Sequence, residues 1–519
     1  MTQPVAVLES PQALYEQLRA ARQPFLDRAR EAANLTTPSI LPPEGHTKES
    51  KLITPYQAEG AEGVVNLSSK LLLSLFPAGS SFFRFTAQPS KLSAEQKAAL
   101  DDEEIARAFQ EMASAAERMV MEEFEAKALR PRLNIGLRAL VVTGNVCLHF
   151  DDSDKLRLYH LNEYVVDRDG AGNLLSGCTH EKIAFNALEE GLRMSVAFAN
   201  PGQQYDGTEE ISVYTAFSRV GPDKFQAVQT VGGVESWSAT YTEKELPWLP
   251  LTFVRVDGED YGRGRVEEVL GALRSLEALE ASGLRGAALA AKHVMLNGSG
   301  SGVTNRQLET AQDGAVLSAA DGDRISYLKY DKTQDLSVIF DRVTKLESKI
   351  QRAFLDVGSA VQRQAERVTA EEVRIVALEL EQKLGGVYSS LTQELQLPLV
   401  RFLMRAVERG EDGFDFGEEI QPTIITGLDA LGRGHDFQRL SAFVQAVGSA
   451  LGEGGLAAID GPAIVRQFAV ALSLDPDKVS KTDEQLAAER QQAQQQTLLE
   501  QGTGPAVTAL GNAAQGQAA

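Results

Sequence analysis

Two long helical patterns separated by a short polar break constrain the fold of this chain most strongly. Apolar residues recur at helical spacing from Val266 to Leu279, and the pattern can continue to about Leu296. A helix of ~35 residues spans roughly 50 Å at about 1.5 Å per residue. The break at Asn297–Gly302 reads NGSGSG, and helical spacing returns over Leu336–Ile350. The sequence therefore predicts two long helices that flank a small excursion.

Three helical segments precede this pair. The first begins at Ser10, an N-cap that is followed by proline at the first helical position. The second opens at Thr54 and continues until Pro77 stops it. The third runs from about 93 to 129, and Pro131 is expected to end it. The N-terminal part of the chain is therefore expected to be helical.

Between about Val141 and Pro250 the pattern changes to that of strands. β-branched and aromatic residues alternate with polar ones in segments such as Arg157–Tyr159 and Ile211–Tyr214. Turns rich in glycine or aspartate separate these segments. The expected fold class is therefore α+β, mainly α with one strand-containing part.

A basic stretch follows the second long helix. Residues 353–367 are small and polar, and they continue a patch that begins on the helix; the basic residues are Lys349, Arg352, Arg363 and Arg367. On a monomer, ordinary salt-bridged surface charge explains such a patch more readily than a binding site does.

The C-terminal part begins with a strong helix start. Thr369–Glu372 fits a capping box, and the helix that it opens places apolar residues on one face as far as Leu395. The last ~35 residues are rich in Gln and Ala and lack the large apolar residues that a packed core needs. A helix that frays into disorder is expected there.

The charge balance limits how the chain can bind nucleic acid. It has 51 Lys and Arg residues against 72 Asp and Glu, a formal net charge of −21. A broad phosphate-neutralising face needs the opposite balance, so any DNA contact is expected to be weak or local. No apolar run approaches the ~18 residues of a membrane span, and the N-terminus lacks a secretory pattern. Synthesis in a reducing cytoplasm, with reduced thiols, is expected.

A doubled Cys-x-His pattern is the sharpest chemical constellation. Cys147 with His149, and Cys178 with His180, could form a Cys₂His₂ zinc site if the two pairs lay on adjacent strands. The spacing differs from the usual C-x₂₋₄-C and H-x₃₋₅-H patterns, so core cysteines with surface histidines are the favoured interpretation. No phosphate loop, complete dinucleotide fingerprint or nucleophile elbow occurs. Neither an enzymatic activity nor a cofactor is predicted.

Several sequence blocks match a known family in an unchanged order. They are RAREAANLTTPSILPP (28–43), TPYQAEGAEGVVNLSSKLLLSLFP (54–77), Gly144-Asn145, YVVDRDGAGN (164–173), DGEDYGRGRVEEVLGALRSLE (257–277), the stretch 359–401, and QPTIITGLDALGRGHD (421–436). Through these blocks the chain resembles the head-to-tail connector, or portal, family of podoviruses of the autographivirus type. The resemblance covers about residues 10–440.

For the fold, the resemblance implies a portal ring of twelve subunits around a central channel. Each subunit would divide into wing, stem, clip and crown, and rotational symmetry would close the ring through heterologous contacts. The implied boundaries are 1–261 and 369–435 for the two parts of the wing, 262–296 and 332–352 for the stem helices, 297–331 for the clip, 353–368 for the channel loop and 436–519 for the crown with its tail.

For function, the resemblance implies a structural portal at one capsid vertex, present in the host cytoplasm during assembly and then in the virion. Double-stranded DNA would pass non-specifically through the channel during packaging and ejection. Rings of Arg363 and Arg367, with Arg352 and Lys349 nearby, would contact it. The other implied partners are the major capsid protein, scaffolding protein, internal core proteins, the terminase large subunit transiently, and then tail adaptor and tail tube proteins. No membrane partner is implied.

Two other interpretations stay open on the sequence. A metal-dependent nucleic-acid enzyme would be built around the two Cys-x-His pairs. An internal or scaffolding virion protein would need only acidic, alanine-rich helices. The polar break at Asn297–Gly302 between two long helices favours the portal over both.

Overall fold

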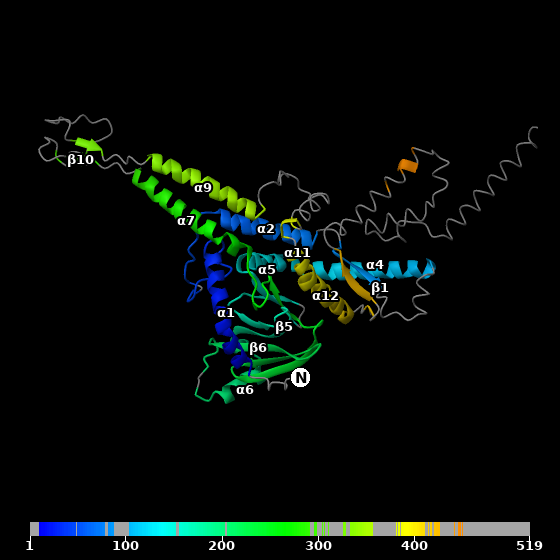
Figure 1. Ribbon diagram of the computed structural model, residues 1–519. Coiled ribbons are helices and arrows are strands. Elements are labelled where there is room, and N and C mark those ends of the chain that lie inside the picture. The colour runs from blue at the N-terminus through cyan, green and yellow to red at the C-terminus, as the bar shows by residue number, and fades with distance from the viewer. Residues whose placement is uncertain are drawn as a thin grey trace, which may run out of the picture. The chain divides into compact units, whose positions relative to one another are not determined.

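Long helices and antiparallel sheets make up the structure, a computed structural model (Figure 1). It describes residues 10–47, 49–77, 81–87, 103–151, 155–202, 205–290, 295–297, 333–355 and 386–410, with shorter stretches and single positions between 304 and 449. The chain divides into a larger unit (1–77, 120–368 and 379–415) and a smaller one (78–119, 369–378 and 416–519). Helices and sheets together confirm the predicted α+β class. Within the described residues, no helix is long and apolar enough to cross a membrane.

Two antiparallel sheets form the strand-containing part of the larger unit. The first has the order β3–β2–β9, with bounds Leu156–Tyr159, Asn145–Phe150 and Trp248–Thr252. The second has the order β4–β5–β6–β7–β8, with bounds Tyr164–Arg168, Leu174–Ala184, Glu210–Gly221, Lys224–Val231 and Val234–Thr242. Gly232 and Gly233 join β7 to β8, with φ of +57° and +87°. A two-residue hairpin turn favours such angles, which glycine adopts at little cost.

Helix α1 (Pro11–Asn34) covers one face of the five-stranded sheet. As predicted, Ser10 caps it, because the Ser10 side chain accepts a hydrogen bond from the Ala13 amide at 3.3 Å. Tyr15 packs against Cys178 in the sheet. Arg22 is buried, and its guanidinium donates to the Tyr164 carbonyl at 2.8 Å. A buried arginine that finds backbone acceptors ties the helix firmly to the sheet.

The larger unit also contains the helices α2 (Glu59–Leu75), α5 (Leu129–Thr143), α7 (Arg265–Ala290) and α9 (Thr333–Ala353). Helices α7 and α9 lie side by side, and α2 contacts both (Figure 1). Between α7 and α9, β10 (Met295–Asn297) pairs antiparallel with β11 (Ile325–Tyr327). Two long helices flanking an excursion are therefore confirmed. The first helix is shorter than predicted, because Leu296 lies in β10.

Two of the predicted helix boundaries were wrong. Pro131 lies in the first turn of α5, where its missing N–H is tolerated, and the break before α5 is at Ala128, with φ of +48°. Helix α2 begins at Glu59 instead of Thr54. The residues in between are held outside the helix, because the Tyr56 amide donates to Glu277 of α7 and the Gln57 side chain accepts from the Gly60 amide.

The remaining elements lie between the strands of the larger unit, after the second long helix, or in the smaller unit. A nearly continuous helix comprises α11 (Gly386–Leu391), a π-helical turn η3 (Thr392–Gln396) and α12 (Leu397–Arg409). A short α6 (Glu190–Ala199) follows the 3₁₀ turn η1 (Phe185–Ala187). In the smaller unit, β1 (Phe83–Ala87) pairs with β12 (Ile420–Ile424). Helix α4 (Glu103–Ala126) crosses the boundary in sequence. The capping box at Thr369–Glu372 and the Gln-rich tail lie outside the described residues.

A clamp of amide and backbone groups joins the base of α7 to the sheets. Asn145 Nδ2 donates to the Gly262 carbonyl at 2.8 Å, and the Gly262 amide donates to Asn145 Oδ1 at 2.7 Å. Gly144 has φ of +77°, and a Cβ there would lie 2.5 Å from the carbonyl carbon of Arg263. A Cβ on Gly264 would lie 2.7 Å from a carbonyl oxygen of α5. These approaches require glycine. We call this arrangement the Asn145–Gly262 clamp.

Asn145→Ala is expected to lower the free energy of unfolding by about 2–4 kcal/mol, because two buried backbone groups of Gly262 would lose their partners. Urea unfolding followed by tryptophan fluorescence measures the change. Asn173→Ala is the matched control, since Asn173 is exposed and bonds only within its own turn. Equal stability of the two variants would contradict the clamp.

Candidate functional site

The last turns of α9 carry the described half of the predicted basic patch. Lys349 and Arg352 are exposed, whereas Val343 and Ile350 on the opposite side of the helix are buried. The sequence of α9 therefore has the period of an amphipathic helix, in which apolar residues lie on one side and the basic residues on the other. Arg363 and Arg367 lie outside the described residues, so the four predicted site residues divide into two that are described and two that are not.

The chain that leaves α9 is fixed at three successive residues. Arg265 Nε donates to the Ala353 carbonyl at 3.0 Å, and Lys70 Nζ donates to the Leu355 carbonyl. Phe354 is fully buried against Gly63, where an added Cβ would lie 2.4 Å from the Phe354 ring. The predicted channel loop (353–368) therefore starts from a fixed point. We call residues 353–355 the loop anchor.

The loop anchor also holds an unfavourable backbone conformation. Leu355 has φ of +60°, in the left-handed region that costs a residue with a Cβ about 1–2 kcal/mol. Its amide donates to the Arg352 carbonyl at 3.2 Å, which ends the helix. Such a conformation persists where the surroundings over-determine it. The contacts to Lys70, Arg265 and Gly63 supply that constraint, and no sequence motif marked them.

Acidic side chains lie further along the same helical pair. Glu347 of α9 has its carboxyl pKa raised, first by burial and then by the carboxylates of Glu59 and Glu280. Glu277 accepts hydrogen bonds from the Tyr56 and Gln57 amides.

The structure contradicts the predicted zinc alternative. Cys147 and His149 lie in β2, whose neighbours are β3 and β9, whereas Cys178 and His180 lie in β5 of the other sheet. Cys178 and His180 face α1, with Cys178 in contact with the Pro11 carbonyl. No group of three or more potential metal ligands occurs in the part of the chain that the structure describes.

Both thiols are core groups, as the favoured interpretation held. Cys147 and Cys178 are buried, and burial raises the pKa of each thiol far above its ordinary value. The prediction that the two histidines lie on the surface was wrong. His149 stacks on Trp248 with ring centroids 4.5 Å apart, and His180 stacks on Tyr214 at 4.6 Å. Each imidazole therefore serves as a partly buried aromatic ring.

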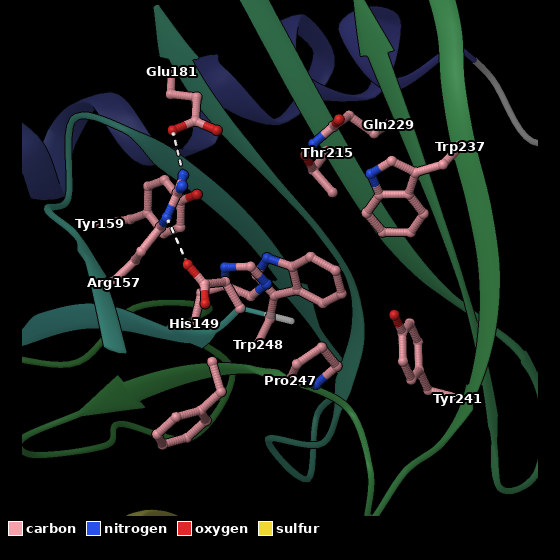
Figure 2. A pocket seen from close by; sticks show the side chains of 12 residues that line it. His149, Arg157, Tyr159, Glu181, Thr215, Gln229, Trp237, Tyr241, Pro247 and Trp248 are labelled. Atoms are coloured by element: carbon pink, nitrogen blue, oxygen red, sulfur yellow. Dashed lines mark hydrogen bonds and ion pairs between the residues drawn. The ribbon is translucent and has the colours of Figure 1, made fainter. Parts of the chain in front are cut away.

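A cavity of about 160 Å³ lies between the two sheets (Figure 2). His149 and Trp248 form one wall, and Arg157 crosses the cavity to form ion pairs with Asp151 and Glu181, each at 3.3 Å. No local motif could have revealed this group, because its members come from strands that are distant in sequence. The only hint of this cavity in the sequence is Trp248, a large aromatic residue of the kind that is usually buried.

The charges in this cavity are paired with one another. Burial, with a contribution from the Arg157 cation, lowers the pKa of His149 to about 4, so the ring is neutral at pH 7. Burial raises the pKa of the Glu181 carboxyl, and the Arg157 guanidinium opposes that effect. The described lining residues include no nucleophile bonded to a base, which nucleophilic catalysis would need. The arrangement is consistent with a structural link between the two sheets.

Comparisons with known proteins point to one family along nearly the whole chain. A family model described as bacteriophage head to tail connecting protein matches residues 9–479. The portal protein of Escherichia phage T7 is 36% identical over 98% of this chain and 95% of its own length. The portal protein of Enterobacteria phage T3 is 35% identical over 98% of this chain and 97% of its own length.

One solved structure covers most of the chain at low similarity. The neck of an empty GTA particle, computed with C6 symmetry, aligns over 81% of this chain and 91% of its own, with 13% identity and a TM-score of 0.38. A score this low supports no argument about architecture. The family of this chain is therefore assigned from the sequence relatives alone.

Lys70→Met is expected to destabilise the protein by about 1.5–3 kcal/mol, because the Leu355 carbonyl would lose a charge-assisted hydrogen bond. Thermal unfolding compares this variant with Lys51→Met, which removes an exposed lysine. A loss no greater than that of the control would mean that the loop anchor does not depend on Lys70.

The low pKa of His149 predicts a specific pH dependence. The folded state keeps the ring neutral down to pH of about 4, whereas the unfolded chain takes up a proton near pH 6.5. The neutral His149 ring therefore contributes to the free energy of unfolding in full above pH 6.5. This stability is lost as the pH falls toward 4, and the loss reaches about 2 kcal/mol at pH 5. His149→Phe, which retains an aromatic ring beside Trp248, should lose less stability than the wild type between pH 7 and pH 5. Identical losses in denaturant unfolding would exclude His149 as the source.

Proposed function

The chain belongs to the bacteriophage head to tail connecting protein family, in which it acts as a portal, and we propose that twelve copies of it form a closed ring at one capsid vertex. Its role is structural and not enzymatic. The zinc-dependent enzyme is excluded as an alternative by the separation of the two Cys-x-His pairs, and family membership favours the connector over a scaffolding protein. As a portal, the protein is a component of the virion.

The helical pair supports the proposed division of each subunit. Helix α7 falls within the proposed first stem helix (262–296), and α9 nearly coincides with the second (332–352). The clip (297–331) contains the β10–β11 pair. The proposed wing comprises 1–261 and 369–435 and includes both sheets, and 436–519 would form the crown and tail.

The observation that carries the proposed site is the anchored, basic end of α9. Lys349 and Arg352 are exposed just before the loop anchor, which begins the proposed channel loop (353–368), and Arg363 and Arg367 follow the anchor in sequence. Twelvefold repetition around a channel would turn each of these residues into a ring of positive charge. We therefore assign these four residues to contact DNA in the channel.

The proposed electrostatics suit a conduit. A chain with a net charge of −21 presents mostly acidic walls, which repel phosphates and prevent adhesion. A narrow basic ring holds the DNA by attraction that salt screens within about 10 Å. Contacts of this kind go to the backbone and carry no base information, so the conduit accepts any sequence.

The proposed partners follow from the same role. The sequence contains no phosphate loop, so a separate terminase large subunit would supply the packaging energy and dock transiently on the clip. Tail adaptor and tail tube proteins would take that surface after packaging. The major capsid protein, scaffolding protein and internal core proteins would contact the ring from the head, during assembly in the host cytoplasm and afterwards in the virion.

Arg363→Ala combined with Arg367→Ala is expected to leave ring assembly intact and to reduce the fraction of stable DNA-filled heads, because the basic rings would be lost. Electron microscopy of purified rings and density sedimentation of heads measure the two effects. Arg19→Ala combined with Arg132→Ala removes two arginines of α1 and α5 as a control. Normal DNA retention in the loop variant would refute the site assignment.

A further inference from the structure

Helix α12 has one open side, and arginines occupy it. Its buried residues are Leu399, Val400, Phe402, Leu403, Met404 and Ala406. On the remaining side, Arg401, Arg405 and Arg409 follow one another at intervals of four residues, which places them in a row along the helix. Arg401 and Arg405 are partly buried. We call these two residues the α12 arginine pair.

The α12 arginine pair has no carboxylate partner within the described chain. Neither residue forms an ion pair there, whereas Arg157, Arg219 and Arg263 each do. The Arg405 guanidinium donates to backbone carbonyls instead, from Nη1 to Glu245 at 3.3 Å and from Nε to Arg401 at 3.4 Å. The carboxylate of Glu245 itself accepts a hydrogen bond from the Thr242 hydroxyl at 2.7 Å.

This arrangement is unfavourable within one subunit. Like charges four residues apart on a helix repel each other. Burial lowers the pKa of both Arg401 and Arg405, and the carboxylates of Glu245 and Glu408 offset this effect in part for Arg405. Within the described residues, neither guanidinium has a carboxylate at ion-pair distance, although the chain is rich in acidic residues. The missing ion pairs point to an anion from outside the subunit.

The helix holds the α12 arginine pair on a rigid support. Phe402 stacks on Phe150 with ring centroids 4.2 Å apart. In the helical segments that lead into α12, the side chain of Gln396 in η3 donates to the Leu75 carbonyl, and the Tyr388 hydroxyl in α11 donates to the Ser74 carbonyl at 3.1 Å. These bonds satisfy carbonyls in the last turn of α2, which would otherwise lack donors. A preorganised surface of this kind suits a specific contact.

We propose that the α12 arginine pair binds carboxylates of a neighbouring copy of this chain and so helps to close the ring; this rests on the ring formation proposed above. In a ring with heterologous contacts, each surface meets a different surface of the same sequence. With a net charge of −21, that second surface is far more often acidic than basic. Nucleic acid fits less well, because two arginines, of which Arg405 is already under the influence of the Glu245 and Glu408 carboxylates, offer few phosphate contacts.

Arg401→Gln combined with Arg405→Gln tests the proposal on the full chain. Mass photometry at a series of protein and NaCl concentrations gives the ring fraction, and thermal unfolding of the dissociated subunit gives its stability. We expect half-dissociation at about tenfold higher protein concentration for the variant, and a smaller effect of salt than in the wild type. The subunit melting temperature should stay unchanged or rise, because a repulsion is removed. Arg19→Gln combined with Arg132→Gln is the matched control and should behave as the wild type.

The other outcomes separate the possible roles. Equal ring stability in the variant and the control overturns the proposal. A lower melting temperature that by itself accounts for fewer rings also overturns it and makes the arginine pair structural. Unchanged rings with weaker binding of a DNA duplex would assign the pair to nucleic acid instead. Failure of the wild type to form rings at any concentration would remove the proposed ring, and this inference with it.

Discussion

The reciprocal amide pair between Asn145 and Gly262 fixes where the long helices leave the sheets. Both ends of this contact are buried, so each backbone group of Gly262 needs the partner that Asn145 provides. The glycines beside it allow three chain segments to approach more closely than a Cβ would permit. Helix α7 begins three residues later, and its direction is therefore set by the strand-containing part of the unit.

The loop anchor plays the same part at the other end of the helical pair. Arg265, in the first turn of α7, holds the Ala353 carbonyl, so the start of one helix is tied to the end of the other. Lys70 and Gly63 of α2 complete the anchor. The loop anchor therefore restricts the direction in which the following backbone can continue. In the proposed portal, this geometry would present identical loops to a shared channel from every subunit.

Local patterns predicted the elements well, and tertiary contacts determined what the patterns missed. Ser10 and Pro11 gave the start of α1 correctly, because capping is a property of neighbouring residues. Pro131 misled, since a proline in a first turn and one that ends a helix look alike in sequence. The doubled Cys-x-His pattern was interpreted correctly for the cysteines, which are buried, but not for the histidines, which stack on Trp248 and Tyr214 through contacts that only strand pairing creates. Lys349 and Arg352 were singled out from the sequence, and both are exposed at the end of α9. The loop anchor beside them could not be predicted, because it depends on contacts between distant residues, such as Lys70 and Leu355, which are 285 positions apart.

The central claim is that identical copies of this acidic chain close into a ring around a channel. Negative-stain imaging of the purified protein, together with mass measurement in solution, tests it most directly. The account predicts rings of about twelve subunits with a central hole. A stable monomer or dimer at all concentrations would contradict it.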